Sequence, residues 1–322
     1  MVAFTRFREY AGSNGLRKRA TNEGGLDMTT TLGTRLPLIQ GALAGISKAS
    51  LVSAVSRAGG LGVLTTANRS VERLSESIAA VRAATDQPFA VNLMLQQPNM
   101  AEVVPYLIAH PVPVVTTSAG TPKRFIAALQ AAGTKVVAVI PSVKVAEKMA
   151  ALGADAIVAE GMESGGHIGT ETTFSLVRQV TAAVDLPVYA AGGIADAAGV
   201  KAAEALGAVG VQVGTAFMVA HETSISAAYK AAIVAANDTA TVVTGHALGD
   251  AVRCLNNPLT DAYFKAEAAG ASADELHALL DGSLERAIAG DLEHGTLMAG
   301  QIAGMIQGTA PAATIVNRLY PQ

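Results

Sequence analysis

A single histidine, His167, lies in the glycine-rich stretch Glu160–Gly169, and three of the five positions from 165 to 169 are glycine. Because glycine has no Cβ atom, such a backbone can approach a flat or charged group closely. The stretch follows the apolar run Ala156–Ala159, which predicts a buried strand. A long loop with one imidazole at the carboxyl end of a strand is typical of α/β enzyme active sites. The alternative interpretation is a surface turn with a solvated histidine.

Two more glycine turns follow the next two predicted strands. One contains Gly192 and Gly193, and the other contains Gly214 and Thr215. In a barrel enzyme, turns after strands seven and eight at helix starts commonly form a phosphate pocket. Their backbone N–H groups and the Thr215 hydroxyl would hold the phosphate. Tight turns without a ligand remain the alternative.

Few polar side chains accompany these turns, namely Asn92, Glu160, Gln212 and Gln301. Apart from Glu160 they are uncharged amides, which both donate and accept hydrogen bonds. This set suits the edge of a flat heterocycle better than a metal ion. No cluster of His, Asp and Glu has the spacing of a zinc site, so no metal site is expected.

Nucleophilic catalysis has weak support in the sequence. Ser164 lies near His167, but it has neither a Gly-x-Ser-x-Gly elbow nor a clear acid partner. Cys254 is the chain's one cysteine, and its neighbours indicate a half-buried segment. We therefore expect neither a hydrolase triad nor a cysteine nucleophile.

Short apolar runs alternate with segments of helical period from Leu36 onward. The predicted strands are Leu36–Gln40, Leu61–Thr65, Phe89–Leu93, Val112–Thr116, Lys135–Ile140, Ala156–Glu160, Val188–Ala191 and Val209–Gly214. The predicted helices are Lys48–Arg57, Val71–Ala84, Met100–Ala109, Pro122–Ala131, Val143–Leu152, Phe174–Val184 and Ala197–Leu206. Strict alternation with nearly continuous apolar strands predicts an α/β fold of the (β/α)₈ TIM-barrel type. A doubly wound open sheet is less expected, because the first turn lacks Gly-x-Gly-x-x-Gly.

The alternation fails after the eighth strand, which predicts an insertion. We expect residues 28–221 and 286–322 to form the barrel, and residues 222–285 to form a small helical lid or substrate domain. Residues 1–27 have clustered arginines and no apolar segment. They are interpreted as a disordered leader, or alternatively as a basic tail that docks another molecule.

Composition narrows the range of partners. The chain has 322 residues and a net charge of −3 with its charges spread, so nucleic-acid binding is not expected. No apolar run approaches the roughly 20 residues of a membrane span. A single cysteine fits a reducing compartment, so a cytoplasmic location is expected.

Several segments resemble the nitronate monooxygenase (2-nitropropane dioxygenase) superfamily of flavin barrels, from about Gly33 to the C-terminus. Within it, they are most similar to the flavin-dependent enoyl-acyl-carrier-protein reductase II. The segments are Glu160-Gly-Met-Glu-Ser-Gly-Gly-His-Ile-Gly169, Ala190-Ala-Gly-Gly-Ile-Ala-Asp196, Val211-Gln-Val-Gly-Thr215, Met298-Ala-Gly-Gln-Ile-Ala-Gly304, Ala58-Gly-Gly-Leu-Gly62, Val91-Asn-Leu-Met-Leu95 and Gly290-Asp-Leu-Glu-His-Gly295.

The resemblance implies that FMN binds at the barrel's carboxyl face and that His167 is the catalytic histidine. The phosphate would lie near Gly192, Gly193, Gly214 and Thr215. The isoalloxazine ring would lie near Gly41, Ala42, Leu43, Asn92, Gly165, Gly166 and Gln301, with Ser164 and Met298 also in the cofactor-binding set. Glu160 and Gln212 would bind the ribityl chain or the ring edge.

Two segments depart from the reductase pattern. The pattern Gln-Gly-Gly-Met-Ala-Trp is here Gln40-Gly-Ala-Leu-Ala-Gly45, which reshapes the mouth of the site near the flavin. The pattern Val-Gly-Thr-Arg-Phe is here Val213-Gly-Thr-Ala-Phe217, so a cation on the phosphate side is missing. Backbone donors would then hold more of the phosphate.

The resemblance implies reduction of enoyl-acyl-carrier-protein thioesters, with NADH or NADPH as reductant and acyl carrier protein as partner. It also implies a homodimer and allows a bound monovalent cation. The alternative activity is oxidation of alkyl nitronates with FMN and oxygen. A non-enzymatic barrel that only binds a phosphorylated ligand is the third hypothesis.

Overall fold

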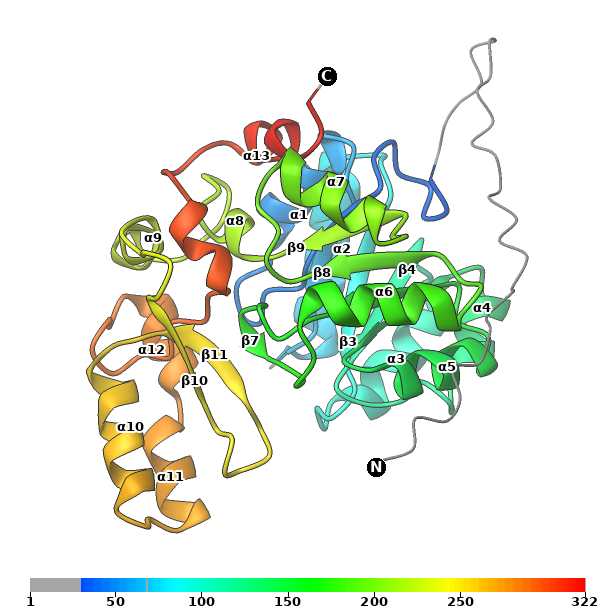
Figure 1. Ribbon diagram of the computed structural model, residues 1–322. Helices are drawn as coiled ribbons and strands as arrows, with labels where there is room; N and C mark the ends of the chain where they lie inside the picture. Colours follow the sequence, from blue (N-terminus) through cyan, green and yellow to red (C-terminus); the bar gives the residue numbers. More distant parts are fainter. Residues whose placement is uncertain (1–29, 68, 322) are drawn as a thin grey trace, which may run out of the picture.

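The computed structural model describes residues 30–67 and 69–321, in which eight parallel strands form a (β/α)₈ barrel (Figure 1). The strand order is β1-β9-β8-β6-β5-β4-β3-β2. The barrel strands are β1 (Leu38–Gln40), β2 (Gly62–Thr65), β3 (Phe89–Met94), β4 (Val114–Ser118), β5 (Lys135–Ile140), β6 (Ala156–Glu160), β8 (Val188–Ala191) and β9 (Gly210–Val213). All eight coincide with predicted strands, so the predicted fold class is confirmed.

The barrel closes between β1 and β2 through a short seam. Ile39 bridges Leu61, and the Gln40 and Leu61 backbone N–H groups donate across the seam at 2.9 and 2.7 Å. The buried Gln40 side chain extends it, because its Oε1 accepts from the Val63 N–H at 3.2 Å. Its Nε2 donates to Ser47 Oγ at 3.0 Å, so the same side chain fixes the loop that follows β1.

Apolar side chains of the strands fill two layers, as expected for strands buried on both faces. The inner layer fills the barrel with Val63, Val114, Val158, Tyr189 and their neighbours. The outer layer packs the strands against surrounding helices, whose bounds are α1 (Ala49–Arg57), α2 (Val71–Ala84), α3 (Met100–Ala109), α4 (Ile126–Ala131), α5 (Val143–Ala151), α6 (Thr173–Ala183) and α7 (Ala197–Ala205).

The segment 222–285 lies beside the barrel and contains a β-hairpin as well as the expected helices (Figure 1). The hairpin strands are β10 (Thr241–Thr244) and β11 (Val252–Leu255). β11 also pairs with β7 (Gly166–His167), so the predicted loop after β6 contributes a strand to this second sheet. The remaining elements are α8 (Thr215–Met218), α9 (Ala227–Val234), α10 (Pro258–Ala268), α11 (Ala273–Leu280), α12 (Ser283–Ala289), the 3₁₀ helix η1 (Gln301–Met305) and α13 (Ala312–Leu319).

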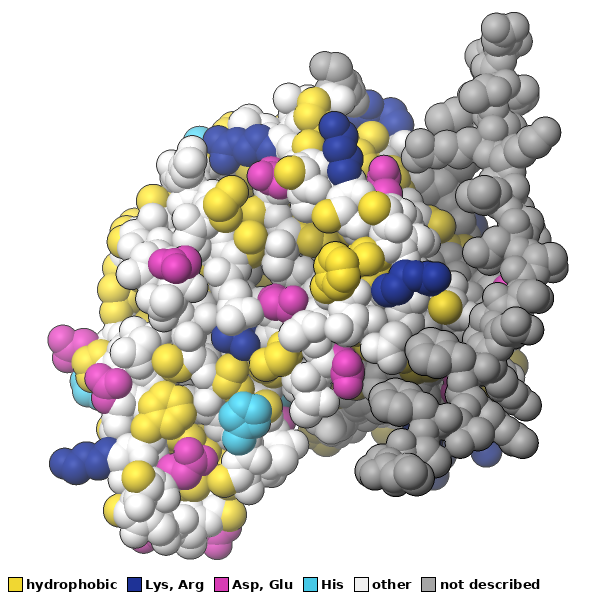
Figure 2. Space-filling model, viewed as in Figure 1, with side chains coloured by type: hydrophobic (Ala, Val, Ile, Leu, Met, Phe, Trp, Pro, Cys, Tyr) yellow, Lys and Arg dark blue, Asp and Glu magenta, His cyan; other side chains and the backbone are white. Residues whose placement is uncertain are grey.

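The exact limits of the domains stay a prediction, and the expected leader, residues 1–27, lies outside the described residues. Within the described part of the chain, no helix has the length and apolarity that a membrane crossing requires. On the face shown in Figure 2, acidic and basic side chains are interspersed, which agrees with the spread of charge along the sequence.

Candidate active site

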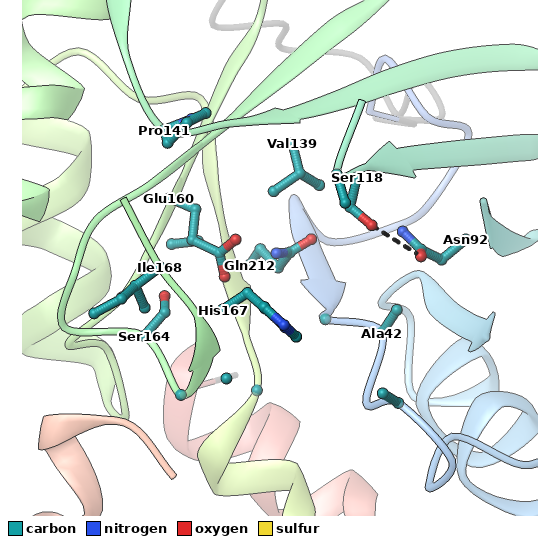
Figure 3. Close-up of a pocket in the computed structure, with 18 of the residues that line it drawn as sticks. Ala42, Asn92, Ser118, Val139, Pro141, Glu160, Ser164, His167, Ile168 and Gln212 are labelled. Carbon is teal, nitrogen blue, oxygen red and sulfur yellow. Dashed lines mark hydrogen bonds between the residues drawn. The ribbon is translucent and has the colours of Figure 1, made fainter. Parts of the chain in front are cut away.

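A cavity of about 680 Å³ opens at the carboxyl ends of the barrel strands. Every barrel strand contributes its last residue or the one after it, namely Gly41, Thr65, Met94, Ser118, Ile140, Glu160, Ala191 and Val213. Of the predicted site residues, the structure brings together Gly41, Ala42, Leu43, Asn92, Glu160, Ser164, Gly165, Gly166, His167, Gly192, Gly193, Gln212, Gly214, Thr215 and Met298. Figure 3 shows part of this lining.

Gln301 differs from that prediction. It begins the 3₁₀ helix η1, its side chain is exposed, and it is absent from the cavity lining, to which Ala299 and Ile302 contribute instead. Its backbone N–H donates to the Glu163 carbonyl at 2.9 Å. The position therefore holds two loops together through its backbone, which sequence patterns do not distinguish from a ligand contact.

His167 is held at the cavity by the second sheet rather than by the barrel. It pairs with Val252 of β11, and the Ile168 N–H donates to the Ala251 carbonyl at 3.0 Å. The His167 Nε2 atom lies 3.3 Å from Oδ1 of Asp250, the residue before Ala251, and both residues line the cavity. The two side chains are 49% and 60% exposed, so His167 is accessible to a ligand.

Asp250 was not predicted as a site residue. It closes the hairpin turn between β10 and β11, where its N–H donates to the Gly245 carbonyl at 3.1 Å. The Gly245 N–H in turn donates to the buried Tyr263 hydroxyl of α10 at 3.1 Å. The placement of Asp250 thus depends on the insertion's own packing, and no local sequence signal marks it.

Glu160 ends β6, and its carboxyl group points into the cavity together with the Gln212 side chain (Figure 3). Burial raises the pKa of Glu160 to about 7, and a hydrogen bond from Ser164 opposes this rise. A carboxyl group with such a pKa can donate or accept a proton near neutral pH.

Gln212 is 8% exposed, and its side chain makes no hydrogen bond to any described residue. Because Gln212 lines the cavity, its amide can donate to and accept from a ligand there. Asn92 differs, because its Nδ2 donates to Thr116 Oγ1 at 2.9 Å and its Oδ1 accepts from Ser118 Oγ at 3.3 Å. This fixes the orientation of the Asn92 amide at the cavity wall.

The turn after β9 leaves an open space beside its backbone. A Cβ atom at Gly214 would meet only Leu43 Cδ2, at 3.6 Å, so the protein itself does not require glycine there. Thr215 is buried beside it, and its Oγ1 accepts from the Gly300 N–H at 2.9 Å. The hydroxyl proton of Thr215 remains available to a ligand. The turn therefore leaves room for a ligand beside its backbone.

Other glycines of the site are required by the protein. A Cβ atom at Gly165 would lie 2.6 Å from the Ala299 carbonyl carbon, and one at Gly300 would lie 2.7 Å from the Glu163 carbonyl oxygen. These glycines let the His167 loop pack directly on the segment before η1. Glu163 strengthens the same loop, because its carboxylate accepts from the Thr173 N–H and hydroxyl at 2.8 Å.

Cys254 is fully buried, and burial raises the pKa of its thiol to about 12. It therefore lacks the thiolate character of a nucleophile. No group of three or more His, Cys, Asp and Glu that could hold a metal ion occurs within residues 30–67 and 69–321.

Comparison with known proteins identifies the family. A family profile described as nitronate monooxygenase matches residues 27–108 and 101–322, nearly the whole chain. The chain belongs to the nitronate monooxygenase family. A nitronate monooxygenase of Pseudomonas aeruginosa is 32% identical over 350 residues, which cover 91% of this chain and 98% of the relative.

Another relative is named as a dehydrogenase rather than as a monooxygenase. The (3aS,4S,5R,7aS)-5-hydroxy-7a-methyl-1-oxo-octahydro-1H-indene-4-carboxyl-CoA dehydrogenase of Mycobacterium tuberculosis is 36% identical over 237 residues, which cover 73% of this chain and 67% of the relative. The chain thus matches about two thirds of that protein's length.

Two solved structures share the whole barrel. FabK from Thermotoga maritima has a TM-score of 0.87 and 42% identity over 90% of this chain and 93% of its own. Nitroalkane oxidase from Streptomyces ansochromogenes has a TM-score of 0.81 and 30% identity over 90% of this chain and 96% of its own. The protein is therefore an oxidoreductase of the nitronate monooxygenase family.

Proposed function

We propose that the cavity binds FMN, with its phosphate at the Gly192-Gly193 and Gly214-Thr215 turns. The open space beside Gly214 and the available Thr215 hydroxyl fit a phosphate. The partner-free Gln212 amide fits the polar edge or ribityl chain of the cofactor. Mass spectrometry of the ligand released from the denatured protein should find FMN; FAD would contradict the assignment.

The reaction we propose is the reduction of the carbon–carbon double bond of an enoyl thioester, with NADH or NADPH as electron source. Bound FMN would supply the hydride that adds at the β-carbon. A proton must reach the α-carbon while negative charge builds on the thioester oxygen. His167 would donate this proton or stabilise the charge, held in place by Asp250.

The observation that carries the choice of substrate is the apolar wall of the cavity beyond the glycine turns. Val139, Pro141, Val145, Met149 and Ile168 line it, on β5, its following turn, α5 and the segment after β7. Such a wall suits an acyl chain. The 42% identity to the FabK structure, against 30% to the nitroalkane oxidase structure, supports the same choice.

Anaerobic stopped-flow absorbance tests this proposal. NADH or NADPH should bleach the flavin rapidly, and a crotonyl thioester should then reoxidise it without oxygen. A flavin that is bleached but never reoxidised by any enoyl thioester would contradict enoyl reduction. Acyl carrier protein is the proposed partner for the natural thioester.

Nitronate oxidation is the second candidate, and the His167–Asp250 pair favours it. An accessible imidazole can accept a proton from a nitroalkane or bind the anion that remains. Oxygen consumption with an alkyl nitronate, without any nicotinamide cofactor, would favour this candidate. Bound FMN without turnover of either substrate would favour the non-enzymatic hypothesis.

A further inference from the structure

A second cavity, of about 710 Å³, lies beside the first on the same face of the barrel. Its walls are the loops after β1 and β2, the first turns of α2, and α12. Ala44, in the loop after β1, lines both cavities. A ligand that extends across this loop can therefore occupy both.

Arg69 is the main cation of the second cavity, and it is half-buried. Its Nη1 donates to Ser77 Oγ and its Nη2 donates to the Ser47 carbonyl, both at 3.1 Å. Within the described residues it forms no ion pair with a carboxylate. Burial lowers the pKa of this guanidinium, which is the expected effect of an uncompensated charge. Among residues 30–67 and 69–321, only two of its five N–H donors have a partner, so an anion would be favoured beside it.

Arg69 is also held in place, as a binding residue requires. Asn99 Nδ2 donates to the Arg69 carbonyl at 2.7 Å and to the Thr66 carbonyl at 3.1 Å, which fixes the loop after β2. Ser47 in turn receives the bond from Gln40 that holds the loop after β1. Asn99 thus holds the loop after β2, and Gln40 at the barrel seam holds the loop after β1.

Two further cations, Lys48 and Arg73, line this cavity with two carboxylates, Glu76 and Glu285. The formal balance is therefore one positive charge. The remaining lining includes an apolar surface from α2 and α12, made by Ala80, Leu284, Ile288 and Ala289. A cationic rim above an apolar surface suits a ligand with a phosphate at one end of a less polar arm.

We propose that this second cavity binds the phosphate end of a pantetheine-type thioester carrier, with Arg69 as its principal ligand. The inference rests on the proposed enoyl-thioester reduction. The thioester would lie in the first cavity, and the pantetheine arm would pass over Ala44 to the second. A planar guanidinium with free donors forms strong, paired hydrogen bonds with phosphate. Coenzyme A and acyl carrier protein both present this chemistry.

The test compares the holoenzyme with its Arg69→Gln variant on two substrates. Crotonyl-coenzyme A carries the phosphates, and crotonyl-N-acetylcysteamine lacks them. The KM for crotonyl-coenzyme A, divided by the KM for crotonyl-N-acetylcysteamine, should rise about tenfold in Arg69→Gln, because charge-assisted hydrogen bonds to phosphate are lost. Arg124→Gln, on a residue outside both cavity linings, is the matched control and should leave this ratio unchanged. An unchanged ratio in Arg69→Gln would overturn the proposal.

Crotonyl-acyl carrier protein is the third substrate and separates the two sources of the phosphate. If Arg69→Gln raises the KM for crotonyl-acyl carrier protein, the cavity is assigned to the protein-bound carrier. If it raises the KM for crotonyl-coenzyme A alone, the cavity is assigned to the free carrier. Arg73→Gln repeats the comparison if Arg69→Gln loses its flavin or its fold.

Titration calorimetry with coenzyme A keeps the test independent of turnover. If the wild-type holoenzyme reduces no enoyl thioester, the proposed activity fails, but the cavity can still be judged. Weaker binding of coenzyme A to Arg69→Gln than to wild type would then support the phosphate site. Equal affinity, or no binding by wild type, would overturn it.

Discussion

At the scale of single residues, His167 is the side chain to which we assign the proton transfer of the proposed reaction. It lines the cavity with Asp250 Oδ1 3.3 Å from its Nε2, and it is the one histidine among the described residues that does so. We expect His167→Ala to retain FMN and to lose turnover by roughly 10²–10⁴-fold if the imidazole is a general acid. Flavin reduction by NADH should slow less than reoxidation by the enoyl thioester, as stopped-flow absorbance would show. Normal turnover with both enoyl thioester and nitronate would make the histidine structural.

Glu160 predicts a specific dependence of stability on pH. Its folded-state pKa of about 7 lies above its ordinary value, so between these values the folded state retains a proton that the unfolded state has lost. Stability should therefore fall as pH rises through this window, by at most about 3 kcal/mol, and less where cavity water solvates the carboxylate. Glu160→Gln removes this dependence. The melting temperature of wild type relative to Glu160→Gln should decrease from about pH 5 to about pH 8.

A substitution at Gly214 should weaken ligand binding without affecting folding. Its Cβ space touches only Leu43, so Gly214→Ala should keep the melting temperature of the FMN-free protein while crowding the phosphate. We expect FMN affinity to weaken about tenfold or more, which fluorescence titration would measure. Gly165→Ala is the contrast, because its Cβ would collide with the Ala299 backbone and should lower the stability itself. An unchanged dissociation constant for Gly214→Ala would contradict phosphate binding at this turn.

At the scale of elements, the second sheet holds the loop that contains His167. Arg253 of β11 is 4% exposed, and its Nε donates to the Met162 carbonyl at 2.8 Å. Its Nη1 donates to Thr241 Oγ1 of β10 at 3.1 Å. The side chain thus joins the hairpin to the loop after β6, which contains His167.

Arg253→Ala should therefore affect stability and catalysis together. Loss of these two bonds from a charged donor to half-buried acceptors should cost about 1–3 kcal/mol in denaturant unfolding. The kcat should also fall, since the loop before β7 loses its tie to the hairpin. Arg253→Lys retains the charge but not the two-point geometry, so an intermediate effect is expected. A destabilised variant with unchanged kcat would show that the tie is not needed for catalysis.

The sequence predicted the barrel well because its signals are local. Buried parallel strands are continuous apolar runs, and six of the eight predicted strand ranges contain or equal the observed strands, as at Lys135–Ile140. The strand ends then bring Glu160, Gln212 and the glycine turns together without further information. The pairing of β7 with β11 could not be predicted, because it joins two distant segments, one of them only two residues long. Asp250 and Arg253 were missed for this reason.

At the scale of the whole molecule, the cofactor should contribute to stability. FMN contacts would come from turns after many different strands, so only the closed barrel can bind it. A ligand that binds the folded state alone stabilises it by about 2.7 kcal/mol at 100 times its dissociation constant. We expect removal of FMN to lower the melting temperature by several degrees and added FMN to restore it. Added riboflavin, which lacks the phosphate, should restore less; equal recovery would argue against phosphate binding at the glycine turns.

The pairing of β1 with β9 has a consequence for how the chain acquires its shape during synthesis. Leu38 is matched with Val211, so the first strand finds its main partner only after nearly two thirds of the chain has been made. Contacts between residues so distant in sequence form slowly, because the entropy of closing a long loop is lost before the contacts contribute favourable free energy. The short seam through Gln40 gives β1 little support from β2 in the meantime. A nascent chain that stops before β9 would thus expose the edges of β1 and β8, where association with other chains begins.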